Sequence, residues 1–168
     1  MNEDLNETKN LAYLEVFKSY FSGISHLFEK SKDLPLSVLV LVLKKDATDR
    51  DRTLNLSFLP FDDDDLSQIN PLQFYSILPI NYNGDREDVN NLILKLNQFS
   101  AIGGFSINNN NEIILRYIHC IPRFEIYQKE SLEEVINLFV KNMDVLGSKI
   151  ESCINGNLSS EEIISNLI

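Results

Sequence analysis

The sequence predicts an α+β fold, in which an antiparallel sheet of about five strands packs against helices. Strand-like segments occur in two groups, and helical segments lie around these groups instead of alternating with single strands, which is typical of this class. The expected order is α-β-β-β-α-β-β-α, followed by a short C-terminal helix. With 168 residues, 43% of them hydrophobic, the chain has the size of one domain with one core. We therefore expect residues 1–168 to form a single domain.

The N-terminal segment predicts a long amphipathic helix from about Asp4 to Lys32. Its apolar residues recur every three or four positions: Leu11, Leu14, Phe17, Phe21, Ile24 and Phe28. A second apolar strip lies beside the first and consists of Tyr13, Val16, Tyr20 and Leu27. This stripe is wider than one packing partner usually needs. Either a sheet covers all of it, or part of it faces another protein.

Three strands are expected next. Leu36–Lys44 is a continuous run of leucine and β-branched residues, typical of a central strand that is buried on both faces. A charged connection separates it from Thr53–Phe61, where apolar and polar residues alternate as in a half-buried strand. After the acidic loop Asp62–Asp65, the segment Pro71–Tyr82 predicts a third strand, in which Pro79 indicates an edge or a bulge.

A helix, a hairpin and two further helices complete the fold. Apolar residues at helical spacing from Val89 to Phe99 predict the second helix, and the pair Gly103-Gly104 bends the backbone into the hairpin. The turn Asn108–Asn111 joins the hairpin arms Phe105–Ile107 and Glu112–Ile121. Two capping boxes, Ser131 with Glu134 and Ser159 with Glu162, predict the starts of the third and the last helix, and Gly156 lies between these helices.

Charge and composition exclude several classes of function. The chain has 15 Lys and Arg against 25 Asp and Glu, a formal net charge of -10, which repels phosphate backbones and anionic lipids. We expect neither nucleic acid nor a membrane as partner. The first ten residues lack the apolar stretch of a signal peptide, and the run Val38–Leu43 is too short to cross a bilayer. The two cysteines form no metal-binding or redox pattern, so we expect a cytoplasmic protein.

No group of residues has the pattern of a catalytic site. His119 and Cys120 are neighbours in a predicted strand, so they point to opposite faces and cannot act as base and nucleophile together. His26 is interpreted as a surface or boundary histidine. Asp62–Asp65 lacks the ligand spacing and the glycine of a calcium loop. We expect no catalytic residue, no metal and no cofactor, and hence no enzyme.

Arg116 and Tyr117 are the candidates for a polar site. Arg116 is a charged residue in the middle of a predicted strand. Either it pairs with an acid across the sheet, or its guanidinium reaches a ligand. A small-molecule binder or an enzyme would need a pocket around Arg116, Tyr117 and His119.

Part of the chain resembles a known family. The segments LQFYSILPI and LILKLNQFSAIGGFSINNNNEIILRYIHCIPRF, between Leu72 and Phe124, resemble the type III secretion chaperone-like superfamily and the YbjN-like family within it. The residues that stand out are Asn97, Gly104, Arg116 and Tyr117. The resemblance implies a single domain of this type that forms a homodimer and presents apolar grooves to a segment of a client protein.

These observations together predict a non-enzymatic protein-binding module of the chaperone or adaptor type. The expected groove holds an extended or helical segment of the partner and is lined by Tyr13, Phe17, Tyr20, Leu27, Phe58 and Phe74. The acidic loops favour a client with basic flanks. The alternative is a regulatory or structural subunit that uses the apolar strip only to form a homodimer.

Overall fold

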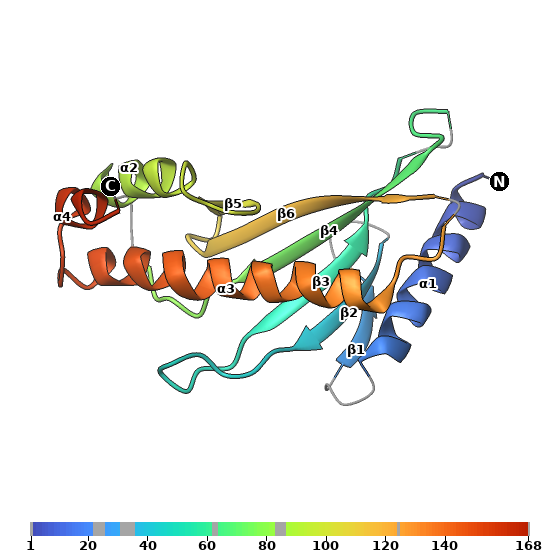
Figure 1. The fold of residues 1–168 in the computed structure, drawn as a ribbon, viewed down its shortest axis with the longest axis horizontal. Coiled ribbons are helices and arrows are strands. Elements are labelled where there is room, and N and C mark those ends of the chain that lie inside the picture. Colours follow the sequence, from blue (N-terminus) through green and yellow to red (C-terminus); the bar gives the residue numbers. More distant parts are fainter. Residues whose placement is uncertain are drawn as a thin grey trace. The chain divides into compact units, whose positions relative to one another are not determined.

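The computed structural model describes residues 2–21, 26–30, 36–61, 64–82, 87–123 and 125–167. Its elements (Figure 1) are α1 (Asn2–Tyr20), β1 (His26–Lys30), β2 (Ser37–Val42), β3 (Thr53–Phe58), β4 (Ile69–Ile77), α2 (Glu87–Leu96), β5 (Gly104–Ile107), β6 (Ile113–Pro122), α3 (Lys129–Ile154) and α4 (Ser160–Ser165). The strands form a sheet in the order β1-β2-β3-β4-β6-β5. The predicted α+β class is confirmed, with one strand more than the five expected.

The additional strand, β1, lies where the sequence predicted the end of the first helix. Helix α1 ends at Tyr20, and His26–Lys30 pairs antiparallel with β2, so that Leu27 lies opposite Val40 and Phe28 opposite Leu39. The predicted helix to Lys32 is therefore wrong, because β2 offers this segment backbone hydrogen bonds that a helical pattern in the sequence does not reveal. Ile24 and Lys32 lie outside the described residues.

Other boundaries also differ from the prediction. Strand β4 ends at Ile77, so Pro79 follows the strand and marks neither an edge nor a bulge. Helix α3 begins at Lys129, which places Ser131 inside the helix and rules out the first capping box. The second capping box is confirmed: the Ser159 hydroxyl accepts a hydrogen bond from the Glu162 amide, and the Glu162 carboxylate accepts one from the Ser159 amide.

The chain divides into two compact units. Unit 1 comprises Met1–Ser76 and Ile118–Glu133, and unit 2 comprises Ile77–Tyr117 and Glu134–Ile168. Strands β4 and β6 and helix α3 have residues in both units. In unit 1, α1 packs on β2 and β3, and in unit 2, α2 packs on α4 and β5 (Figure 1).

Unit 2 is held together at the turn that follows α2. Gly103 has φ +68°, and its backbone lies so close to β6 that an added Cβ would be 2.5 Å from the Arg116 carbonyl oxygen. This explains the predicted bend at the glycine pair. The side-chain amide of Asn97 accepts from the Phe105 N–H at 2.7 Å and donates to the Phe105 carbonyl at 3.0 Å. Phe105 therefore has no free backbone group for an added strand at the edge of β5.

The two faces of the sheet in unit 1 differ in character. On one face, Leu39, Leu56 and Phe74 lie opposite one another across β2, β3 and β4, and all are buried. On the other face, the corresponding row across β1 to β4 is Leu27, Val40, Asn55 and Tyr75. We call these the inner face and the outer face. Helix α1 covers the inner face, where Phe17 packs against Phe58.

Candidate functional site

The aromatic residues predicted to line a groove gather in unit 1. The ring centroid of Phe58 lies 5.7 Å from Tyr13 and 6.2 Å from Phe17, which is also 6.2 Å from Tyr20. Tyr127 extends the cluster at 6.4 Å from Phe17. These separations are typical of packed aromatic pairs. The sequence thus predicted correctly which aromatic side chains of α1 and β3 lie together.

This aromatic cluster is core and not an open groove. The side chain of Phe17 is 1% exposed, and Phe58 and Phe74 are also fully buried. The expectation that these three side chains are accessible to a partner is wrong, because Phe17 and Phe58 pack between α1 and the sheet. Their burial stabilises the fold of unit 1.

Tyr13 and Tyr20 bind the chain's own backbone. The Tyr13 hydroxyl donates to the Arg123 carbonyl at 2.7 Å, and the Tyr20 hydroxyl donates to the Tyr127 carbonyl at 3.2 Å. Both rings are half-buried. The connection between β6 and α3 therefore occupies the surface of α1 that the sequence suggested for a partner.

His119 is part of the same packing. Its Nε2 lies 2.6 Å from the Tyr127 hydroxyl oxygen, and its ring meets Phe74 edge-on, with centroids 6.4 Å apart. Burial lowers the pKa of His119 below its usual value, so the ring is neutral at pH 7. Cys120 is exposed, in agreement with the predicted alternation of the two side chains. The imidazole thus serves to join β6 to the segment before α3.

The structure does not bring Arg116 and Tyr117 together as a polar site. They are neighbours in the part of β6 that belongs to unit 2, so their side chains point to opposite faces of the strand. Arg116 is exposed, whereas Tyr117 is half-buried. The two side chains cannot converge on one ligand.

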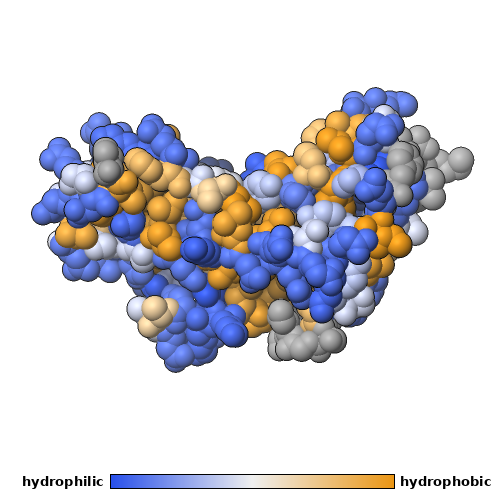
Figure 2. All heavy atoms as spheres, viewed as in Figure 1, coloured by the Kyte–Doolittle hydropathy of each residue, from blue (hydrophilic) through white to orange (hydrophobic). Residues whose placement is uncertain are grey.

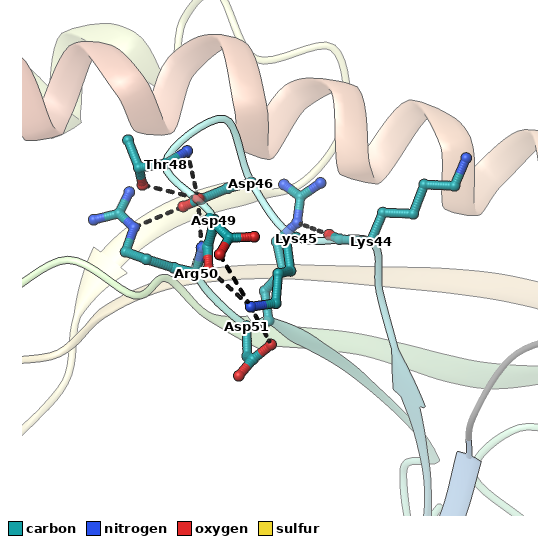
Figure 3. A network of polar contacts seen from close by, with 8 residues as sticks. Lys44, Lys45, Asp46, Thr48, Asp49, Arg50 and Asp51 are labelled. Carbon is teal, nitrogen blue, oxygen red and sulfur yellow. Dashed lines mark hydrogen bonds and ion pairs between the residues drawn. The ribbon is translucent and has the colours of Figure 1, made fainter.

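The charged connection between β2 and β3 is ordered by its own residues (Figure 3). The Asp46 carboxylate accepts hydrogen bonds from the backbone amides of Thr48 and Arg50, the Thr48 hydroxyl and the Arg50 Nε. Burial alone would raise the pKa of Asp46, but these hydrogen bonds outweigh it and hold the pKa well below its usual range. Lys45 Nζ lies 3.4 Å from the Asp49 carboxylate. These interactions explain the charged residues of this loop by their structural role.

The described part of the chain contains neither a metal-binding group of side chains nor a membrane-spanning helix. Within it, no three His, Cys, Asp or Glu side chains are arranged to hold a metal ion. Asp62 and Asp63 lie outside the described residues, as does the side chain of His26. None of the described helices is both long enough and apolar enough to span a membrane.

The outer face in unit 1 is the feature that sequence reasoning missed. Its side chains are Leu27 on β1; Val38, Val40 and Val42 on β2; Thr53, Asn55 and Ser57 on β3; Gln73 and Tyr75 on β4; and Ile118 and Cys120 on β6. The positions on β6 follow from the contact of His119 with Phe74 on the inner face, because neighbouring side chains alternate. Leu27 is the one predicted groove residue on this face.

Apolar side chains of the outer face reach solvent. Leu27 is 43% exposed, and Val42 and Ile118 are each 39% exposed. Val38 and Tyr75 are half-buried. A water-facing side of an antiparallel sheet is normally polar. The sequence signal was present, because β2 reads SVLVLV and is apolar on both faces.

Helix α3 also exposes apolar side chains, but charged side chains lie between them. Figure 2 has the same view as Figure 1, in which α3 faces the viewer. Hydrophobic side chains on this side are interrupted by hydrophilic ones. The exposed apolar residues Leu138 and Val145 have the exposed charged residues Lys141 and Asp144 between them on the helix. They form an ordinary solvent-facing helix surface.

No protein-family model matches the chain, and no curated protein sequence matches it either. The interpretation of the outer face therefore depends on its own chemistry.

Proposed function

We propose that the protein is a non-enzymatic protein-binding module of the chaperone or adaptor type, and that it binds through the outer face of the sheet in unit 1. One observation supports this above all: in unit 1 the outer face exposes Leu27, Val42 and Ile118 beside the buried Val40 and Ser57. None of its described side chains in this unit is charged, and the exposed Arg116 on the same face of β6 belongs to unit 2. Fully buried interface cores are likewise depleted in charge. Exposed apolar surface of this kind is characteristic of a protein contact.

The proposed binding surface is the outer face and not the groove along α1 that the sequence suggested. Phe17 and Phe58 are buried, and the hydroxyls of Tyr13 and Tyr20 bind the backbone of the same chain. A client on α1 would first have to displace the backbone of Arg123 and Tyr127. Strand addition at β5 is also disfavoured, because Asn97 occupies the outward backbone groups of Phe105.

Membership of the type III secretion chaperone-like superfamily, and of its YbjN-like family, stays part of the proposal. The α+β order of elements supports it, with β1 as a departure from the expected pattern. We also propose a cytoplasmic location. Neither Cys120 nor Cys153 forms a disulfide, and an exposed thiol such as that of Cys120 is better tolerated in a reducing compartment.

Two matched variants test the proposal. Val42→Glu places a carboxylate on the outer face, and Val145→Glu makes the same change on α3, where Val145 is 49% exposed. Each tagged protein, and the wild type, is used to retrieve partners from native cytosol, and its fold is checked by circular dichroism. We expect Val42→Glu to lose the retained protein and Val145→Glu to keep it. Equal retention by both variants, or none by the wild type, would overturn the proposal.

A further inference from the structure

We propose that residues 125–128, between β6 and α3, form a pH-dependent clasp over helix α1, which His119 holds closed while its ring is neutral and releases when the ring is protonated. The clasp, His119 and α1 all belong to unit 1. This device concerns a surface other than the outer face, so it does not depend on the proposed function.

The clasp is attached to α1 through Tyr127. The side chains of Glu125, Ile126 and Gln128 are exposed, and Ile126 is 75% exposed although it is apolar. Tyr127 is half-buried, and its ring lies edge-on to Phe17 with the centroids 6.4 Å apart. Segments with few buried apolar contacts open locally at a lower cost in free energy than the core. Loss of the Tyr127 contacts is therefore enough to open the clasp.

His119 connects the Tyr127 side chain to β6. Its Nε2 lies 2.6 Å from the Tyr127 hydroxyl oxygen, and the centroids of the two rings are 5.3 Å apart. A neutral imidazole can accept the hydroxyl proton at Nε2, whereas an imidazolium has only donors. After protonation the hydroxyl has to turn its proton away from the ring, and the half-buried positive charge loses part of its hydration. Protonation therefore weakens the closed state.

The groups around His119 do not favour a positive charge on it. Phe74 faces the ring from β4, and Tyr117, on the same side of β6, belongs to unit 2. The titratable or charged side chains that face the connection between β6 and α3, or form part of it, are Tyr13 and Tyr20 on α1, and Tyr127 and the half-buried Arg123 in the connection itself. The tyrosines are uncharged near neutral pH, and Arg123 has the same sign as an imidazolium. In the first turns of α3, Lys129 lies 3.5 Å from Glu133 and pairs with it.

Burial gives the pH effect its direction. It lowers the pKa of His119 in the closed state, whereas an open clasp returns the ring to water and to the ordinary pKa of about 6.5. Above this pH both states are neutral and the closed state is fully favoured. As the pH falls from about 6.5 towards the lowered pKa, the open state binds a proton that the closed state does not bind, so opening becomes more favourable.

Opening uncovers a part of α1 that the closed clasp protects. The Tyr20 hydroxyl loses the Tyr127 carbonyl as its acceptor, and the side of Phe17 that meets the Tyr127 ring becomes accessible to water. Phe17 keeps its contact with Phe58 on the sheet. The aromatic strip of α1 is then a second apolar surface, covered at neutral pH and reachable in mild acid.

A protease that cleaves after glutamate reports opening at Glu125. Cleavage follows the population of the open form when opening and closing are fast relative to cleavage. Each rate is divided by that of a synthetic peptide of residues 120–132 at the same pH, which removes the pH dependence of the enzyme. We expect the normalised rate at Glu125 to rise several-fold from pH 7.5 to pH 5.0, with unchanged circular dichroism. Cleavage at Glu112, in the turn between β5 and β6, is the control and keeps its normalised rate.

The matched variant is His119→Gln, whose side-chain amide can still bond to the Tyr127 hydroxyl but does not titrate. We expect its cleavage at Glu125 to be the same at both pH values. A wild type whose rate does not change, or a rise of the same size in His119→Gln, would overturn the proposal.

NMR titration of the wild type gives a second test that needs no variant. The His119 ring signal is identified by its contacts with the ring protons of Phe74. We expect it to titrate below the ordinary pKa of histidine, and its contacts with the Tyr127 ring to disappear over the same pH range. Titration at or above the ordinary value, or contacts that persist in acid, would contradict the clasp.

Discussion

Replacing Phe17 by alanine tests whether the aromatic strip of α1 is core. The ring is 1% exposed and packs against Phe58, Tyr20 and Tyr127. Removing a buried phenylalanine side chain costs about 3–5 kcal/mol, because apolar burial is lost and a cavity remains. Domains are stable by only about 5–15 kcal/mol, so this is a large part of the total. The neighbouring residue Val16 is 42% exposed, and Val16→Ala changes the stability by no more than about 0.5 kcal/mol.

Urea unfolding followed by circular dichroism measures both variants. With a slope of about 2 kcal/mol per molar urea, the loss expected for Phe17→Ala lowers the unfolding midpoint by about 2 M. The slope has to match that of the wild type, because a changed slope would indicate a changed unfolding transition. A loss below about 1 kcal/mol, similar to that of Val16→Ala, would refute the packing of α1 described here and return its aromatic strip to the candidate binding surfaces.

Three further changes have defined outcomes. Gly103→Ala destabilises the fold by more than about 2 kcal/mol, because φ is +68° and the new Cβ meets the Arg116 carbonyl. Gly156 has a similar φ of +71° but open space around it, so Gly156→Ala costs about 1 kcal/mol in the same urea titration. Asp46→Asn lowers the melting temperature at pH 7. The lowered pKa of Asp46 stabilises the fold above pH 4, and this contribution is lost as the pH falls through the folded pKa, so the wild-type and variant curves must converge in acid. Asn55→Val leaves stability unchanged or raises it by about 1 kcal/mol, because the buried Asn55 Oδ1 has no hydrogen-bond partner among the described residues. A clear loss of stability would show that the amide is satisfied in solution.

The sequence predicts most of the fold because alternation and helical spacing are local. The strands around Leu54, Phe74 and Leu115 and the helices α2 and α3 follow from these patterns. The end of the first helix does not, since the spacing of Phe21 and Phe28 suits a helical face even though Phe28 lies in a strand. The choice between helix and strand there depends on pairing with β2, which the segment itself does not encode.

The prediction of the candidate site was limited in the same way, by contacts with distant segments of the chain. Spacing identified Tyr13, Phe17 and Tyr20 as one aromatic strip, and they do lie together. What covers the strip is the connection after β6, more than a hundred residues away, which no local pattern reveals. The outer face was detectable in principle, because the valines that alternate with leucines in β2 predict burial on both sides.

The most direct test of the proposed binding face is to measure which methyl groups a soluble paramagnetic chelate reaches by NMR. We expect the methyl groups of Val42 and Ile118 to relax rapidly, as those of Val145 do, whereas those of the buried Leu39 and Leu56 stay protected. Protection of Val42 and Ile118 similar to that of Leu39 would contradict the proposal, because the chain itself would then cover the outer face.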